Sequence, residues 1–316
     1  MQKRLDYLDI AKGIGILLVI IGHCQIGNCQ ISMLGNIHSY LYSFHMPLFF
    51  FISGVCFSNK ATFDSLVKKR FKQLILPTIW FSFITILVVD GLGLQVEWWD
   101  WSDHLPFSLW FLPVLFFAQL LSFCIIRRIH NIRIFILVLF ALVLILHIAV
   151  KASVKSPYSS LAIPIATFYY LLGYKMKDII IRSKTKFLTV ACLCASNIIV
   201  VRLFGVSSEL ASGFSSPVFI AEVAAICGLL SVIAFSKVIT EIGGGISLML
   251  IWFGRNSLSI MLVHQLLKIV FDAYFPCLVV LGNKSYILVQ LVWTVISSVI
   301  VTKIINSYCP IILGKK

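Results

Sequence analysis

Residues 9–27 read DIAKGIGILLVIIGHCQIG, an apolar run of membrane-spanning length that nevertheless contains an aspartate, a lysine and a histidine. A helix that crosses the hydrocarbon core of a bilayer needs roughly 20 mostly apolar residues. Similar runs follow and predict helices near 37–58, 73–93, 108–126, 134–150, 160–175, 187–205, 217–236, 253–273 and 285–305. We therefore expect an all-α, polytopic membrane helical bundle with about ten transmembrane helices, in one domain over residues 1–316.

The composition agrees with a membrane protein rather than a soluble one. Apolar residues make up 60% of the chain and charged residues 12%, against about 45–50% and about 25% in soluble domains. We interpret residues 241–253, which contain three consecutive glycines, as a loop or a partly inserted segment. The nine cysteines lie mostly inside apolar runs, and no Cys/His group has the spacing of metal ligands, so we predict no metal site.

The distribution of basic residues orients the bundle, because Lys and Arg accumulate in cytoplasmic loops. With the N-terminus inside, the loops on the outer side carry three lysines, Lys151, Lys155 and Lys284. The cytoplasmic segments carry nineteen basic residues: Lys3, Arg4, Lys60, Lys68, Lys69, Arg70, Lys72, Arg127, Arg128, Arg133, Lys175, Lys177, Arg182, Lys184, Lys186, Lys237, Lys303, Lys315 and Lys316. We expect both termini in the cytoplasm, and we attribute the net charge of +14 to topology, with no nucleic-acid partner.

The first predicted helix carries side chains that are costly inside a membrane. A charged group at the bilayer centre costs about 2.5–3.5 kcal/mol on insertion scales. His23 lies eleven positions after Lys12, close to three helical turns, so both project from one face, about 16 Å apart. Asp9 lies one turn before Lys12, where the two can pair. Two interpretations are open: a functional array, or Lys12 snorkelling to the inner interface with His23 at the outer one.

Three further polar residues fall inside predicted helices. His45 lies in FHMPLFFFISG, at a depth comparable with that of His23, so the two histidines could share one cavity. Glu222 and His264 could line the same cavity from later helices. Each of the three also fits a structural role as a hydrogen-bonded group of the bundle.

Six segments of the chain resemble motifs of the integral membrane acyltransferase family 3, which O-acylates cell-envelope glycans. RLDYLDIAKGIGILLVIIGH resembles the first helix of that family, whose hallmark of a basic residue, ten residues and a histidine is matched by Lys12 and His23. Lys12 stands where Arg is common, which keeps the charge but removes bidentate recognition. FHMPLFFFISG, KKRFKQLILP, LWFLPVLFF, FYYLLGYKMK and FGRNSLSIMLVHQ resemble later motifs in the expected order. The chain is most similar to the stand-alone sugar O-acetylases, including the fucose 4-O-acetylase-like group.

The resemblance implies transfer of an acetyl group from cytoplasmic acetyl-CoA to a sugar hydroxyl of an envelope polysaccharide or its lipid-linked precursor, in a bacterial inner membrane. The residues expected to act in catalysis are His23 as general base, with Lys12, Asp9 and His45. The residues expected to bind the anionic donor are Lys12, Lys69, Arg70 and Lys72. The residues expected to bind the acceptor are Trp110, Phe111, Glu222 and His264.

Other functions remain possible at this stage. A non-enzymatic transporter or flippase of a lipid-linked sugar would also need many helices and a few buried polar groups. A succinyltransferase of the same family would share every motif. The basic residues 68–72 are by themselves expected in any multi-spanning protein. Besides membrane lipid and a glycan acceptor, the sequence indicates no partner, and it leaves the oligomeric state open.

Overall fold

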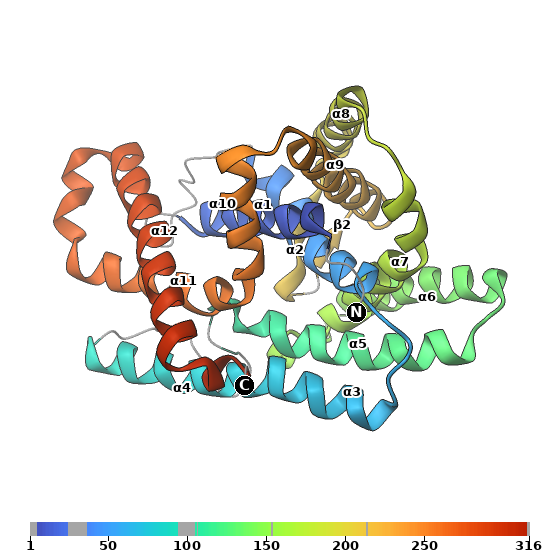
Figure 1. The fold of residues 1–316 in the computed structure, drawn as a ribbon, viewed down its shortest axis with the longest axis horizontal. Helices are drawn as coiled ribbons and strands as arrows, with labels where there is room; N and C mark the ends of the chain where they lie inside the picture. The colour runs from blue at the N-terminus through green and yellow to red at the C-terminus, as the bar shows by residue number, and fades with distance from the viewer. Residues whose placement is uncertain are drawn as a thin grey trace.

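The computed structural model describes residues 5–24, 37–93, 105, 107–152, 154–212 and 214–314, and most of them are helical (Figure 1). The α-helices are α1 (Asp6–His23), α2 (Ile37–Val55), α3 (Phe63–Arg70), α4 (Leu76–Gly91), α5 (Phe111–Arg128), α6 (Ile132–Lys151), α7 (Ala162–Arg182), α8 (Phe187–Phe204), α9 (Ile220–Ile242), α10 (Gly244–Arg255), α11 (Ser257–Tyr274) and α12 (Asn283–Tyr308). A short antiparallel pair, β1 (Ser207–Glu209) and β2 (Phe214–Ser216), follows α8. The expected helical architecture is confirmed.

Seven helical stretches in the described part of the chain are long and apolar enough to cross a membrane. They are Phe63–Gly91, Ser108–Arg128, Ile132–Lys151, Phe187–Phe204, Ile220–Ile242, Ser257–Tyr274 and Lys284–Tyr308. The protein is therefore a polytopic helical membrane protein. The helices α1, α2 and α7, which correspond to three further predicted spans, lie outside this set. The 18 residues of α1, for example, include three charged side chains.

Two regions differ most from the expected helix boundaries. The helix predicted near 73–93 begins at Phe63, because α3 continues through a π-helical turn, η1 (Phe71–Ile75), into α4. The hydroxyl of Thr62 accepts a hydrogen bond from the Ser65 amide and caps this longer helix. Residues 241–253 were expected to form a loop or a partly inserted segment, and most of them form α10, which excludes the loop. With 12 residues, α10 is too short to span a bilayer.

Helix α1 lies near the centre of the molecule, where α10 crosses it (Figure 1). The crossing is close because it is built on glycines. A Cβ atom on Gly13 would collide with the Leu250 carbonyl oxygen, and one on Gly254 would collide with the Asp9 carbonyl oxygen. Small residues let two helix backbones approach in this way inside membranes. The packing on α1 explains why a glycine-rich segment becomes a helix, and it places the end of α10 beside Asp9.

A second glycine-lined crossing joins α2 and α7. A Cβ atom on Gly54 would collide with the Tyr170 carbonyl oxygen, and one on Gly173 would collide with that of Phe51. Both crossings hold α1 and α2 in the interior, while α6, α8 and α12 lie at the edges of the picture (Figure 1). Asp9 on α1 and His45 on α2 are thereby enclosed by protein rather than exposed to lipid.

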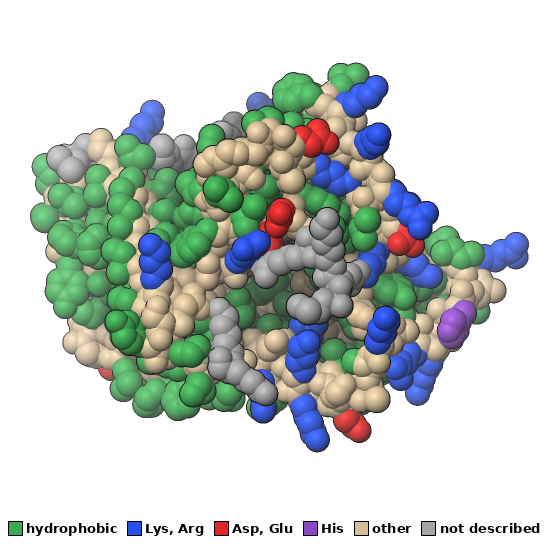
Figure 2. All heavy atoms as spheres, in the orientation of Figure 1, with side chains coloured by type: hydrophobic (Ala, Val, Ile, Leu, Met, Phe, Trp, Pro, Cys, Tyr) green, Lys and Arg blue, Asp and Glu red, His purple; other side chains and the backbone are tan. Residues whose placement is uncertain are grey.

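Segments assigned to the cytoplasm by their charge lie next to one another in space. The guanidinium of Arg127 donates to the Ala61 carbonyl oxygen at 2.8 Å, and Lys177 Nζ donates to the Phe57 carbonyl oxygen at 3.1 Å. On the face shown in Figure 2, Lys and Arg side chains occupy the right and lower parts, and the left part is mainly apolar. These contacts place the basic segments together on one side of the bundle, and the cytoplasmic location of that side stays a prediction.

Candidate active site

Two imidazole rings from distant parts of the chain meet at the end of α1. The ring centroids of His23 and His264 lie 5.3 Å apart in an edge-to-face arrangement. His23 Nδ1 lies 2.7 Å from the Val19 carbonyl oxygen, and His264 Nδ1 lies 3.0 Å from that of Ile260. A carbonyl oxygen only accepts hydrogen bonds, so each Nδ1 carries the proton. In the neutral rings both Nε2 atoms therefore present a lone pair.

His264 is itself almost completely enclosed. Its exposed fraction is 1%, and its Nε2 is buried with no hydrogen-bond partner within the described residues. Buried polar atoms are nearly always satisfied by protein or water, so one that is not calls for a ligand or a functional role. The lone pair of His264 beside His23 is consistent with the predicted substrate-binding role of His264.

His45 belongs to the same cluster through a tyrosine. The Tyr42 ring lies 4.8 Å from the ring of His45 and 6.5 Å from that of His23, centroid to centroid. Its hydroxyl donates to the Gly22 carbonyl oxygen at 3.3 Å, which ties α2 to the end of α1. His45 Nδ1 is bonded to its own helix, at 2.8 Å from the Leu41 carbonyl oxygen. The two predicted histidines thus share one region, in which Tyr42 contacts both.

Sequence reasoning missed Tyr42 and its neighbour His38. Their rings stack at a centroid distance of 3.7 Å. The positions 38, 42 and 45 follow the spacing i, i+4, i+7, which places all three side chains on one face of a helix. That periodicity was visible in the segment 37–58 and would have extended the predicted site.

The other end of α1 carries a buried carboxylate between two cations. Asp9 has an exposed fraction of only 2%. Lys12 Nζ lies 2.7 Å from Asp9 Oδ1, which confirms the expected ion pair. Arg255, a residue the sequence did not single out, places its Nε 3.4 Å from Asp9 Oδ2 and also reaches Asp6 at 3.4 Å. Because a buried carboxylate must be paired, Asp9 fixes the position of Lys12 within the bundle.

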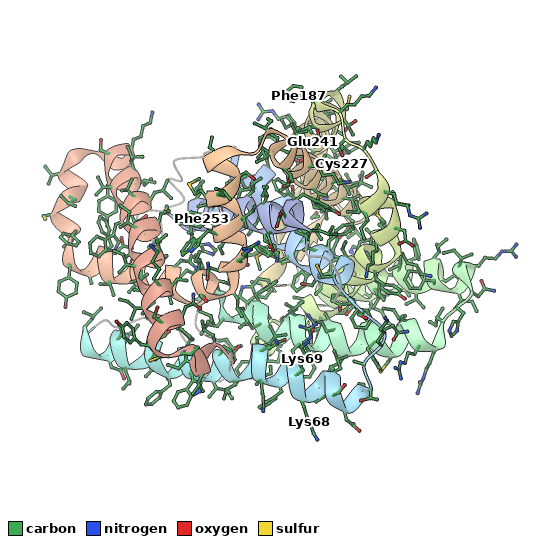
Figure 3. All side chains as sticks on the ribbon, viewed as in Figure 1. Lys68, Lys69, Phe187, Cys227, Glu241 and Phe253 are labelled. Carbon is green, nitrogen blue, oxygen red and sulfur yellow. The ribbon has the colours of Figure 1, made fainter. Side chains whose placement is uncertain are left out.

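The predicted donor-binding cations separate into two groups. Lys69 and Lys72 are exposed, and Lys68 points away from the bundle below α3 (Figure 3). Arg70 is half-buried and donates to Gln73 Oε1 at 3.1 Å, while its Nε is buried and has no partner among the described residues. The buried hydroxyl of Tyr170, within electrostatic range of Arg70, also lacks a partner in the described chain. Arg70 is thus the member of the cluster that faces the interior.

The remaining predicted acceptor-binding residues have different surroundings. Phe111 is 4% exposed and packs against Phe50 at a centroid distance of 4.8 Å, as part of the core. Trp110 is half-buried and keeps part of its ring accessible. Glu222 is buried on α9, within electrostatic range of Tyr169 on α7. The structure therefore places His264 beside His23, whereas Glu222 on α9 lies near Tyr169 on α7.

Comparison with known proteins assigns the chain to a family. The sequence profile of an acyltransferase domain matches residues 5–304. No curated protein and no solved structure matches the chain. The matched range contains the ion pair at the start of α1, the histidines His23 and His264, and, apart from Arg4, every motif that carries the resemblance. The chain therefore belongs to the integral membrane acyltransferase family 3 and is an acyltransferase.

Proposed function

We propose that this protein is a membrane-bound O-acetyltransferase that moves an acetyl group from cytoplasmic acetyl-CoA to a sugar hydroxyl of a bacterial envelope polysaccharide or its lipid-linked precursor. The observation that carries the proposal is His23, whose Nε2 lone pair lies beside a second buried imidazole. A hydroxyl needs a base to attack a thioester, and a positioned histidine is the usual one.

In the proposed reaction, His23 Nε2 takes the proton of the acceptor hydroxyl as its oxygen attacks the thioester carbonyl. An ester bond forms, the carbon–sulfur bond breaks, and His23 passes the proton to the departing thiolate. The hydrogen bond from Nδ1 to the Val19 carbonyl holds the ring in the tautomer that this step needs. General base catalysis of this kind contributes about 10²–10⁴ in rate.

The inner end of α1 supplies groups that suit an anionic donor. Lys12 is held by Asp9 yet keeps a side-chain exposed fraction of 25%, so it can contact a ligand. The buried Nε of Arg70 and hydroxyl of Tyr170 are donors for which a bound phosphate or amide would provide acceptors.

The outer end of α1 supplies groups that suit a sugar. His264 Nε2 can accept from a second hydroxyl next to the one activated by His23. Trp110, with part of its ring accessible, is the candidate for stacking on the apolar face of the sugar. The acceptor would then be bound by one aromatic surface and two imidazole acceptors.

The test is O-acetylation of cell-surface glycan in a knockout complemented with wild type, His23→Gln or the control His130→Ala. Glutamine keeps a hydrogen-bonding side chain but is no base, so we expect about 10²–10⁴-fold less acetylation. His130 is exposed in the loop between α5 and α6, so its variant should match wild type. Full activity of equally abundant His23→Gln would refute the role of His23. If the knockout fails to export the glycan and the wild-type protein consumes no acetyl-CoA, the protein acts as a transporter instead.

A further inference from the structure

One turn beyond His264, the same face of α11 carries an ion pair that the proposed reaction does not yet use. His264, Lys268 and Asp272 follow one another at four-residue intervals, so their side chains line one stripe of the helix. Lys268 Nζ lies 2.9 Å from Asp272 Oδ2, and the side chain of Lys268 is only 18% exposed. A lysine this enclosed in a membrane protein indicates a site rather than an incidental surface charge.

Asp272 is fixed from a second helix. The hydroxyl of Tyr286 and the amide of Gln290, both on α12, donate to Asp272 Oδ1 at 2.7 and 2.6 Å. Together with Lys268 on the other oxygen, the carboxylate accepts three hydrogen bonds. Because two of its donors come from a different helix, the position of the carboxylate is set by tertiary packing. Asp272 therefore acts as a fixed anchor for the ammonium of Lys268.

The ammonium lies close to the proposed base. Lys268 lies one turn from His264 on the same stripe of α11, and the ring of His264 lies 5.3 Å from that of His23, centroid to centroid. Within the described residues its Nζ donates to Asp272 alone, so two of its three N–H bonds are available to a ligand. A cation with free donors, held near a base within the helical bundle, is suited to stabilise negative charge that develops during the reaction.

We propose that Lys268 is a further catalytic residue, whose ammonium stabilises the oxyanion formed on the acyl carbon when the acceptor oxygen attacks at His23. Asp272 is the residue that positions Lys268, and Asp272 is itself held by hydrogen bonds from Tyr286 and Gln290 on α12. The inference rests on the proposed acyl transfer from a thioester to a hydroxyl. In that step the carbonyl oxygen gains the negative charge that Lys268 neutralises, and it returns to a carbonyl when the thiolate leaves.

The competing explanation is that the ion pair only joins α11 to α12. The structure offers a matched control for this, because Trp293 Nε1 on α12 also donates to α11, at 3.2 Å from the Leu267 carbonyl oxygen. Trp293→Phe removes this bond between the same two helices and leaves Lys268 and Asp272 in place. A purely structural role predicts similar effects for the loss of either contact.

The experiment measures kcat and KM for purified wild type, Lys268→Met, Lys268→Arg, Asp272→Asn and Trp293→Phe, together with thermal unfolding in the same detergent. We expect kcat to fall about 10²–10³-fold in Lys268→Met, with KM for acetyl-CoA and the unfolding temperature close to wild type. Lys268→Arg keeps the charge and should retain more activity, and Asp272→Asn should be intermediate. Trp293→Phe should keep the kcat of wild type.

Three results would overturn the inference. Equal kcat for Lys268→Met and Trp293→Phe would assign the ion pair a structural role. A raised KM for the acceptor with unchanged kcat would make Lys268 a binding residue and not the oxyanion partner. Absence of acyl transfer by wild type would overturn the proposed function, and this inference with it, whereas the first two results leave that function intact.

Discussion

Helices α1 and α8 are both 18 residues long, and yet they have opposite relations to their surroundings. Only 17% of the residues of α8 are buried, and its exposed side chains include Ile198, Ile199 and Leu203. Ten residues of α1 are buried, and Asp9 is among them. A helix that faces lipid must be apolar, because lipid offers polar groups no hydrogen-bond partners. An enclosed helix can carry charge and imidazole, because its neighbours supply the partners.

The difference explains why α1 is less typical of a transmembrane helix than α8, although it carries the candidate site. Mean hydropathy is highest for α6, at 2.9, and only 22% of that span is buried. Hydropathy alone does not identify the helices that face the lipid, because the span Ser108–Arg128 has a mean hydropathy of 2.3 and 67% of it is buried. In this protein the functional helices are better identified by ionisable residues at helical spacing inside an apolar run.

The largest expected difference in stability is between replacing Asp9 and replacing Asp6, the two aspartates that pair with Arg255. Asp9→Asn leaves Lys12 and Arg255 without the buried anion, and breaking a buried pair costs about 3–5 kcal/mol. We expect a loss at the lower end of this range, because both cations reach water. Asp6→Asn, at a position whose side chain is 51% exposed, should cost about 0–1 kcal/mol. Thermal unfolding in detergent measures both, and equal losses would contradict the assigned importance of burial.

An intermediate effect tests the helix crossing that encloses α1. Gly254→Ala places a Cβ atom against the Asp9 carbonyl oxygen, and overpacking of this kind costs about 1–3 kcal/mol. The control is Gly245→Ala on the same helix, where a Cβ atom meets open space. That variant should be neutral or more stable by up to about 1 kcal/mol, since alanine favours a helix. If both variants unfold at the wild-type temperature, α10 does not pack on α1 in this way.

The smallest effect compares hydroxyl groups in the centre and at the periphery. Tyr42→Phe removes the bond to the Gly22 carbonyl oxygen and should lower the free energy of unfolding by about 0.5–1.5 kcal/mol. Ser196→Ala on α8 removes an exposed bond to the Cys192 carbonyl oxygen and should change it by less than about 0.5 kcal/mol. If the same unfolding assay shows a larger loss for Ser196→Ala than for Tyr42→Phe, the peripheral hydrogen bond contributes more to stability than the central one, contrary to this prediction.

The site was predictable to the extent that it lies on one helix. Lys12, Asp9 and His23 share a face by spacing alone, and the Asp9–Lys12 ion pair follows from their i, i+3 spacing. Arg255 and Lys268 were missed because no local pattern relates either residue to α1. Arg255 lies 246 residues from Asp9, and only the packing of α10 connects them.

Like the site residues, the helix boundaries were predictable where they depend on local sequence and not where they depend on contacts between helices. The apolar runs located the helices to within a few residues in most cases, because the length of a span is set by the thickness of the bilayer. The extension of α4 back to Phe63 and the formation of α10 were missed. Both depend on contacts with other helices: α3 and η1 pack against α5, and α10 packs against α1.

The sequence by itself determined that this protein is a multi-spanning membrane acyltransferase, that most of its helices lie where the apolar runs are, and that Lys12 and His23 share a face. Only the tertiary structure decided that His264 lies against His23, that Arg255 shares Asp9 with Lys12, and that Lys268 lies near the proposed base. The physical reason is that hydropathy records which residues can enter lipid. It does not record which helices become neighbours, because apolar faces are equally compatible with lipid and with one another, and close packing at small residues makes the choice.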